Sequence, residues 1–182
     1  MPSNFLKNYI NDIKSQFELL DPIIFDKLAS TIITAHKNGK KIIIIGNGGS
    51  AAIASHVAVD LTKTAGIRAI NFNEADLITC FANDYGYENW VSEALNSYSD
   101  VGDDAIMISS SGKSPNIINA AIQGRKKGLI IITLSGFLSS NPLKSLGELN
   151  LWVNSTSYNI IEITHCIWLL SLIDYIRGRK LS

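Results

Sequence analysis

Two short loops rich in glycine and serine carry the residues best suited to holding a ligand. The first, GNGGSA at 46–51, follows the apolar run KIIII at 41–45. Its glycines allow positive φ angles and a close approach of a ligand to the backbone. A helix is expected to begin directly after the loop, so its first N–H groups would point at an anion. The same composition also suits an unliganded turn between a strand and a helix, and Gly46, Gly48 and Ala51 fit the loose dinucleotide pattern G-x-G-x-x-G/A.

The second loop, SSSGKS at 109–114, favours a phosphate monoester as the ligand. Its hydroxyls belong to Ser109, Ser110, Ser111 and Ser114. A Rossmann dinucleotide site does not need such a loop, and a Walker loop would need a glycine where Met107 stands. Serines of this kind can also be simple caps and turn formers. Two hydroxyl-rich and amide-rich loops with few Lys or Arg residues nonetheless suit one phosphate on a small polar molecule better than a polyphosphate.

Alternating strands and helices must position these loops. Apolar runs predict strands near 41–45, 67–72, 104–109, 129–134 and 149–153. Helical spacing predicts helices near 4–19, 21–36, 50–64, 74–82, 87–98, 114–127 and 157–177. Strands that are apolar throughout indicate a parallel sheet covered by helices on both faces. In such sheets ligands bind beyond the carboxyl ends of the strands, where both loops would lie.

The composition indicates one α/β domain over residues 1–182, with N-terminal helices at 1–38 and an α/β core at 39–182. The chain is 46% hydrophobic, its net charge is zero and its isoelectric point is near 6.8. Without a basic patch, we expect no nucleic acid as partner. Cys80 and Cys166 fit no metal or redox spacing and are expected to be two buried thiols in a reducing cytoplasm.

No membrane partner is expected either. The N-terminus lacks the apolar segment of a signal peptide. The most apolar C-terminal stretch, near 160–173, is interrupted by polar residues such as Glu162 and His165, and is predicted to be too polar and too short to cross a bilayer.

Four segments of the chain resemble the SIS (sugar isomerase) domain family. They are GNGGSAAIASHVAVDL, CFANDYGYE, ISSSGKSPNIINAA and IITLSG. The resemblance spans about residues 5–178 and is nearest to the phosphoheptose isomerase group, which includes a relative that associates with the DnaA initiator. It implies a flavodoxin-like three-layer α/β/α sandwich with a five-stranded parallel sheet, a homotetramer with sites at subunit interfaces, and a sugar phosphate as ligand. The substrate contacts that it implies are Asn47, Gly48, Gly49, Ser50, Asn83, Asp84, Ser109, Ser110, Ser111 and Ser114.

The resemblance also implies a reaction, and the chain departs from the family at several positions that would carry it. Phosphoheptose isomerases convert sedoheptulose 7-phosphate to an aldose by moving a proton through an enediol, often beside a zinc ion. The family has a histidine and a glutamate where this chain has His56 and Asp60, so the carboxylate arm is one methylene shorter. An alternative for this pair is a hydrogen-bonded contact at a subunit interface.

The C-terminal helix departs further. Ile161 and Leu169 occupy the positions of a glutamine and a histidine in the family, and neither can bind zinc. Glu162 and His165 remain, spaced i, i+3 on one helix. The predicted catalytic residues are therefore Asp60, Glu162 and His165, with Glu162 or Asp60 as the base and His165 as a proton shuttle. No metal is required, and zinc is conceivable only through His56 and Asp60. The alternative for His165 is a hydrogen-bonded core residue.

Three functions follow as hypotheses. The first is an aldose–ketose isomerase of heptose and surface-polysaccharide (lipopolysaccharide) biosynthesis. The second is a non-catalytic phosphosugar-binding or scaffold protein, as the lost glutamine and histidine positions would suggest. The third, a nucleotide or flavin binder, would need an acidic ribose ligand such as Glu74 or Asp76.

Overall fold

The computed structural model describes residues 2–180. At their centre is a five-stranded parallel sheet. The strand order is β2-β1-β3-β4-β5, the order of a flavodoxin-like sheet. The strands are β1 (Ile42–Gly46), β2 (Ala69–Ile70), β3 (Asp104–Ser109), β4 (Ile130–Ser135) and β5 (Leu149–Trp152). All four neighbouring pairs are parallel. This confirms the predicted fold class.

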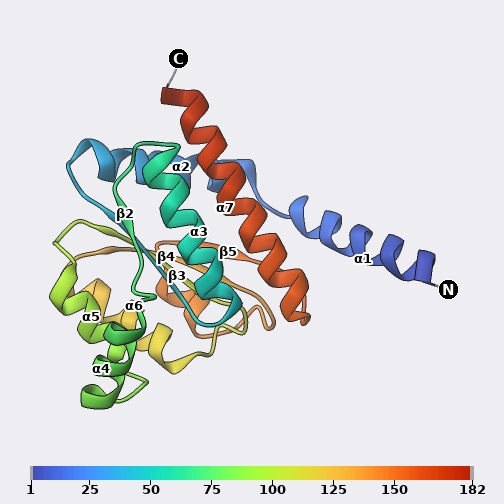
Figure 1. Cartoon of the computed structure of the whole chain (residues 1–182). Helices are drawn as coiled ribbons and strands as arrows, with labels where there is room; N and C mark the ends of the chain where they lie inside the picture. The colour runs from blue at the N-terminus through green and yellow to red at the C-terminus, as the bar shows by residue number, and fades with distance from the viewer. Residues whose placement is uncertain (1, 181–182) are drawn as a thin grey trace.

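The helices form two layers, one on each face of the sheet (Figure 1). One layer contains α2 (Pro22–Lys37), α3 (Gly49–Lys63) and α7 (Tyr158–Lys180), and the other contains α4 (Ala75–Tyr85), α5 (Trp90–Tyr98) and α6 (Pro115–Lys127). A short 3-10 helix, η1 (Leu143–Leu146), precedes β5. Alternate residues of β1 serve the two layers: Ile42 and Ile44 belong to one hydrophobic cluster and Ile43 and Ile45 to the other.

Strand β2 is shorter than the sequence predicts. It pairs with β1 only at Ala69 and Ile70, whereas a strand was expected over 67–72. Beyond this point Asn73 donates hydrogen bonds of 2.7 Å to the Ala51 carbonyl and the Ser55 hydroxyl. These bonds draw the chain toward α3 and away from the sheet, so the pairing ends early.

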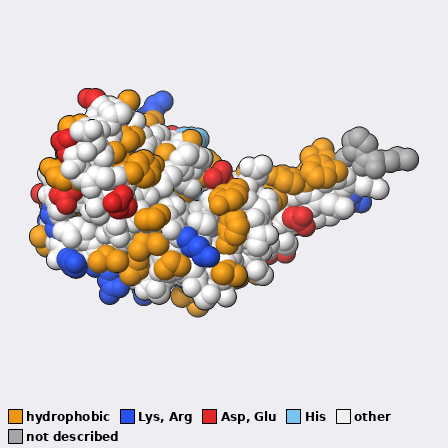
Figure 2. Space-filling model, turned by 90° about the horizontal axis from the view of Figure 1, so that it is seen from below, with side chains coloured by type: hydrophobic (Ala, Val, Ile, Leu, Met, Phe, Trp, Pro, Cys, Tyr) orange, Lys and Arg blue, Asp and Glu red, His pale blue; other side chains and the backbone are white. Residues whose placement is uncertain are grey.

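Helix α1 (Pro2–Phe17) projects from the body of the protein as an arm (Figure 1). Its C-terminal end is anchored, since Phe17 and the following Leu20 pack against the core. The arm carries uncovered apolar side chains, with Phe5 71%, Leu6 58% and Ile10 53% exposed. Figure 2 shows hydrophobic side chains gathered along the arm.

Helix α7 differs from the expectation that the apolar C-terminal stretch could not cross a membrane. Within the described residues, its segment Tyr158–Arg179 is long and apolar enough to cross a membrane, since an 18-residue stretch of it has a mean hydropathy of 1.3. The prediction that this region is too polar and too short to cross a bilayer was therefore wrong. Half of this 18-residue stretch is buried inside the fold, as expected of a core helix. Packing of α7 against α2 and α3 accounts for the buried half, while Ile163 and Ile167 remain 37% and 40% exposed.

Candidate functional site

The first Gly/Ser loop joins β1 to α3 through a backbone that only glycine adopts easily. Gly48 has φ 55° and ψ −121°, and it caps α3 without a side chain. A Cβ on Gly46 would collide with the backbone and side chain of Ser50, so this turn is tight. The loop thus ends at the N-terminus of a 15-residue helix. Its free N–H groups and positive dipole end suit an anion.

The second Gly/Ser loop follows β3 and leads into α6. Ser109 Oγ and Ser114 Oγ lie 3.0 Å apart, and the Gly112 N–H donates to the Ser109 carbonyl at 2.9 Å. Gly112 has φ +64°, and a Cβ there would collide with the Asn141 side chain. Ser111 Oγ accepts a 3.2 Å bond from the Lys113 N–H. The hydroxyls therefore cluster at the start of α6, as expected of a phosphate cradle.

An amide pair that the sequence did not reveal joins the two loops. Asn47 and Asn116 exchange two side-chain hydrogen bonds, each of 2.9 Å. Asn116 is only 1% exposed, and Tyr87 Oη adds a 3.4 Å bond to Asn47 Oδ1. The one signal in the sequence was an amide in the first turn of an expected helix, next to a serine-rich loop. The pair fixes the distance between the two loops.

Removing one member of this pair should destabilise the fold. We expect Asn116→Ala to lower the free energy of unfolding by about 1–3 kcal/mol, because the amide of Asn47 loses its partner in a partly buried setting. Urea denaturation followed by circular dichroism measures the loss. The double variant Asn47→Ala/Asn116→Ala is the control and should cost less than the sum of the single changes. Strictly additive losses would contradict the coupling of the two loops.

Glu162, in the first turns of α7, meets both loops. Its Oε1 accepts a long hydrogen bond of 3.5 Å from Ser110 Oγ. A Cβ on Gly49 would collide with the Glu162 carboxylate, so that glycine leaves the space that the carboxylate occupies. Glu162 is half-buried. The structure therefore brings one predicted catalytic carboxylate between the two predicted anion loops.

His165 lies one turn further along α7 but is buried in the core. It is 0% exposed, and its Nε2 lies 3.2 Å from the Ser135 carbonyl oxygen. Its Nδ1 is buried without a hydrogen-bond partner among the described residues. Burial lowers the pKa of His165 to about 4, so the imidazole is neutral near pH 7. These facts argue against the predicted proton shuttle and match the alternative of a core histidine.

His56 and Asp60 form a surface pair away from the loops. His56 Nε2 and Asp60 Oδ2 are 3.4 Å apart, and the side chains are 55% and 34% exposed. Asp60 follows Ser50 by ten helical residues, which places it about 15 Å further along α3. Within one chain the structure therefore does not bring Asp60 to Glu162.

The residues do not fit a zinc site in the chain as described. A catalytic zinc ion needs about three protein ligands, and His56 and Asp60 offer two. The described part of the chain has no group of three or more His, Cys, Asp or Glu side chains that could hold a metal ion. Ile161 and Leu169 are 0% and 1% exposed, so both are core residues.

Asn83 and Asp84 lie on the last turn of α4, at the edge of the loop region. Asn83 Nδ2 donates to Asp84 Oδ1 at 2.9 Å, and both residues are exposed. The chain then turns at Gly86 and brings Tyr87 to Asn47 of the first loop. Asn83 and Asp84 are thus exposed to solvent at the C-terminal end of α4. The segment that follows this helix contacts the first Gly/Ser loop through Tyr87.

Comparisons with known proteins agree with this architecture. The model of the SIS domain family matches residues 6–136. A phosphoheptose isomerase of Fusobacterium nucleatum is 37% identical over 142 residues, covering 71% of this chain and 73% of that protein. A phosphoheptose isomerase of Sulfurimonas denitrificans is 32% identical over 177 residues, covering 89% of this chain and 90% of that protein.

Solved structures show the same fold. The phosphoheptose isomerase structure from Neisseria gonorrhoeae superposes with a TM-score of 0.87 at 26% identity, covering 97% of this chain and 96% of that one. A phosphoheptose isomerase from Francisella tularensis superposes with a TM-score of 0.88 at 23% identity over the same shares of the two chains.

Proposed function

The chain belongs to the SIS domain family, and we propose that it is an aldose–ketose isomerase of the sedoheptulose 7-phosphate type, acting in heptose and surface-polysaccharide biosynthesis. The observation that carries this proposal is the position of Glu162 between the two Gly/Ser loops. A carboxylate held beside an anion cradle can act on the carbons of the sugar whose phosphate the cradle binds. The names of the relatives at 37% and 32% identity support the choice of substrate.

In the proposed reaction the two Gly/Ser loops bind the sugar phosphate, and Glu162 transfers the proton between C1 and C2. The hydroxyls of Ser109, Ser110, Ser111 and Ser114 and the first amides of α6 would hold the phosphate. Glu162 would take the proton from C1 of the ketose to form an enediol, and return it to C2 to give the aldose. The remaining contacts, from Asn47, Gly48, Gly49, Ser50, Asn83 and Asp84, would orient the sugar chain.

The hydroxyl proton must also pass from O1 to O2. Ser110 is the nearest candidate, because its hydroxyl contacts Glu162. Asp60 would take part only if a neighbouring subunit brought it to the site. No step in this scheme passes through a metal ion, since the donor set of the chain does not fit one.

Deuterium exchange tests the proposal directly. The purified protein is incubated with sedoheptulose 7-phosphate in deuterium oxide, and uptake at the carbon next to the carbonyl is followed by NMR. We expect uptake and formation of the aldose with the 7-phosphate, and none with unphosphorylated sedoheptulose. Fructose 6-phosphate, a ketose phosphate with one carbon fewer, shows whether the exchange depends on the length of the sugar. If no ketose phosphate exchanges, the isomerase proposal fails.

A second candidate function is binding of a phosphosugar without turnover. It is favoured by the burial of Ile161, Leu169 and His165 in the core, which leaves few acid–base groups beside Glu162. This candidate predicts thermal stabilisation by sedoheptulose 7-phosphate without deuterium uptake. Measurable turnover that Glu162→Gln abolishes would rule it out.

We also propose that the protein is a homotetramer assembled through α1. The support is the apolar face of the arm, which a single chain leaves uncovered at Phe5, Leu6 and Ile10. We further propose that residues 1–182 form one SIS domain located in the cytoplasm, in keeping with the free thiols of Cys80 and Cys166. The expectation that both thiols are buried was wrong, because Cys80 is exposed and Cys166 is half-buried.

A charge on the apolar face of α1 should break the assembly. We expect Phe5→Glu to reduce the mass measured by light scattering after size-exclusion chromatography to that of a smaller species, because a buried carboxylate without a partner is costly. Asn4→Glu places the same charge on an exposed polar position one residue away and should leave the mass unchanged. An unaltered mass in Phe5→Glu would exclude this face as the interface.

A further inference from the structure

A cavity lies at the edge of the sheet opposite the Gly/Ser loops. It has a volume of about 520 Å³ and is bounded by α2 and by the chain at the start of β3, β4 and β5. Because the strands are parallel, their first residues lie at the edge away from the two loops. The volume is within the range of about 300–1,000 Å³ found for small-molecule sites. The polar residues of the lining are Lys27, Ser30, Thr31, Thr34, Asn38, Asp104 and Glu148.

Asp104 is a buried carboxylate in this lining, and its Oδ2 has no partner among the described residues. It is 1% exposed, and its Oδ2 is buried without a hydrogen bond from any described residue. Burial, and then the charges of Asp103 and Glu148, raise the pKa of Asp104 to about 7. Lys27 lines the same cavity but forms no ion pair with Asp104 within the described residues. The protein itself thus leaves this carboxylate unsatisfied.

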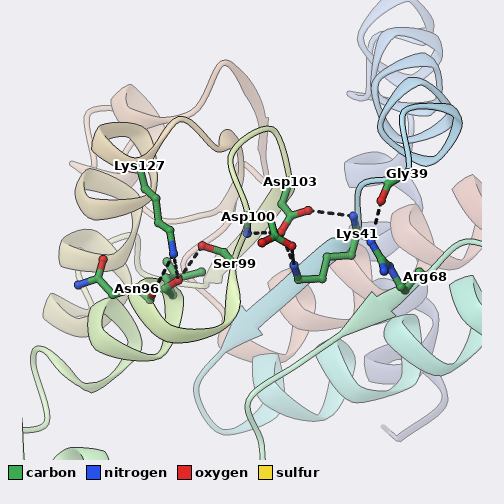
Figure 3. Close-up of polar contacts among 9 residues, drawn as sticks. Gly39, Lys41, Arg68, Asn96, Ser99, Asp100, Asp103 and Lys127 are labelled. Atoms are coloured by element: carbon green, nitrogen blue, oxygen red, sulfur yellow. Dashed lines mark hydrogen bonds and ion pairs between the residues drawn. The ribbon is translucent and has the colours of Figure 1, made fainter.

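The neighbouring Asp103 shows that this edge of the fold can satisfy a buried carboxylate (Figure 3). Asp103 Oδ2 lies 2.6 Å from Lys41 Nζ and accepts from the Asp100 N–H at 2.8 Å, while Oδ1 accepts from the Lys41 N–H at 3.0 Å. Lys41 also pairs with Asp100 at 2.7 Å. Successive residues of an extended chain face opposite sides, so Asp104 is turned away from Lys41.

The threonine hydroxyls of the cavity wall are left to accept hydrogen bonds, whereas Lys27 and Asn38 can donate them. The Thr31 and Thr34 hydroxyls already donate to the carbonyls of Lys27 and Ser30, at 2.9 and 2.8 Å. Their lone pairs remain to accept. Glu148 is exposed at the cavity, whereas Asp104 is buried. Around Asp104 and Glu148, a ligand group that is rich in donors and positive in charge complements this arrangement.

We propose that the cavity binds a small organic molecule with a primary ammonium group, held between Asp104 and Glu148. An ammonium group has three donors, which suits two carboxylates and the hydroxyls of α2. An organic cation fits better than a metal ion, because no cluster of three or more His, Cys, Asp or Glu side chains is found in the described part of the chain. This site is separate from the proposed isomerase site and does not rest on it.

Calorimetric titration at pH 8 of the full chain tests this inference. The probes are 1,4-diaminobutane, arginine and glucosamine, with butane-1,4-diol and glucose as neutral counterparts. We expect at least one amine to bind and its neutral counterpart not to bind. The amine that binds best tells whether a polyamine, an amino acid or an amino sugar is the preferred class. Absence of binding by all three amines would overturn the proposal.

Variants locate the site. Asp104→Asn keeps the size of the side chain and should weaken amine binding at least tenfold, and Glu148→Gln should weaken it less. Asp174→Asn removes the same charge from an exposed position outside the cavity lining and should leave binding unchanged. Equal affinity in Asp104→Asn and the parent would overturn the proposal. Thr34→Val provides a second test at the wall of the cavity if Asp104→Asn does not fold.

Discussion

Replacing Glu162 by glutamine should lower kcat for sugar-phosphate isomerisation by roughly 10²–10⁴-fold, the usual contribution of a general base. Glutamine has nearly the same size and can still accept the hydrogen bond from Ser110, so the loops should keep their positions. It cannot take a proton from carbon. We therefore expect KM and the thermal midpoint to change little, and deuterium uptake from solvent to fall in step with kcat.

Two comparisons make this result specific. Glu18→Gln makes the same change at an exposed carboxylate outside the site and should leave kcat as it is. Asp60→Asn separates the two candidate bases: a loss as large as that of Glu162→Gln would mean that a neighbouring subunit supplies Asp60 to the site. Full activity in Glu162→Gln would remove Glu162 as the base.

Replacing Asp104 by asparagine should stabilise the protein at high pH. The pKa of Asp104 is about 7 in the folded chain, against an ordinary value of 3.8. Between these values the unfolded chain has released this proton while the folded chain still holds it, so the contribution of Asp104 to stability falls as pH rises and is fully lost above about pH 7. Each pH unit in this window costs about 1.4 kcal/mol. Relative to the parent, the variant should gain on the order of 4 kcal/mol between pH 4 and pH 8.

The contribution of His165 to the free energy of unfolding has the opposite pH dependence, so it can be distinguished from that of Asp104. Its pKa is lowered to about 4 from 6.5, so between these values the unfolded chain binds a proton that the folded chain does not. The contribution of His165 to stability therefore rises with pH across this window. In the parent, the two groups offset each other between pH 4 and pH 6.5. In Asp104→Asn the rise due to His165 should become visible.

Urea denaturation at pH 4.5, 6 and 8 measures both effects. The free energy of unfolding of Asp104→Asn should diverge steadily from that of the parent as pH increases, whereas Asp174→Asn should run nearly parallel to the parent. If Asp104→Asn also runs parallel, Asp104 is ionised normally in the folded chain. The same outcome would weaken the case for an unsatisfied carboxylate in the cavity.

The fold could be predicted because its signals are local. The apolar runs of β1 and β3 gave buried strands, and glycines after strands marked the turns into helices. The early end of β2 could not be predicted, because it depends on hydrogen bonds from Asn73 to α3. Such bonds between distant segments have no periodic signature in the sequence.

The site could be predicted only in part, since side-chain direction depends on packing. The spacing of Glu162 and His165 indicates neighbours on one helix, but three residues turn the helix by about 300° and leave the two directions about 60° apart. That angle sends Glu162 to the loops and His165 into the core. Asn116 was missed for a similar reason, because its partner Asn47 lies 69 residues away.

The projecting helix α1 would couple the proposed association of subunits to its own helix formation. Isolated helices shorter than about 12–15 residues are marginal in water even when they are rich in alanine. Helix α1 has 16 residues and no alanine, and among the described residues its C-terminal end is the part that packs on the core of its own chain. The N-terminal turns of α1 gain lasting stability only when another surface covers Phe5, Leu6 and Ile10. If the proposed tetramer assembles through α1, folding of the arm and association of subunits become one equilibrium, and helical ellipticity per residue should decrease as the protein is diluted.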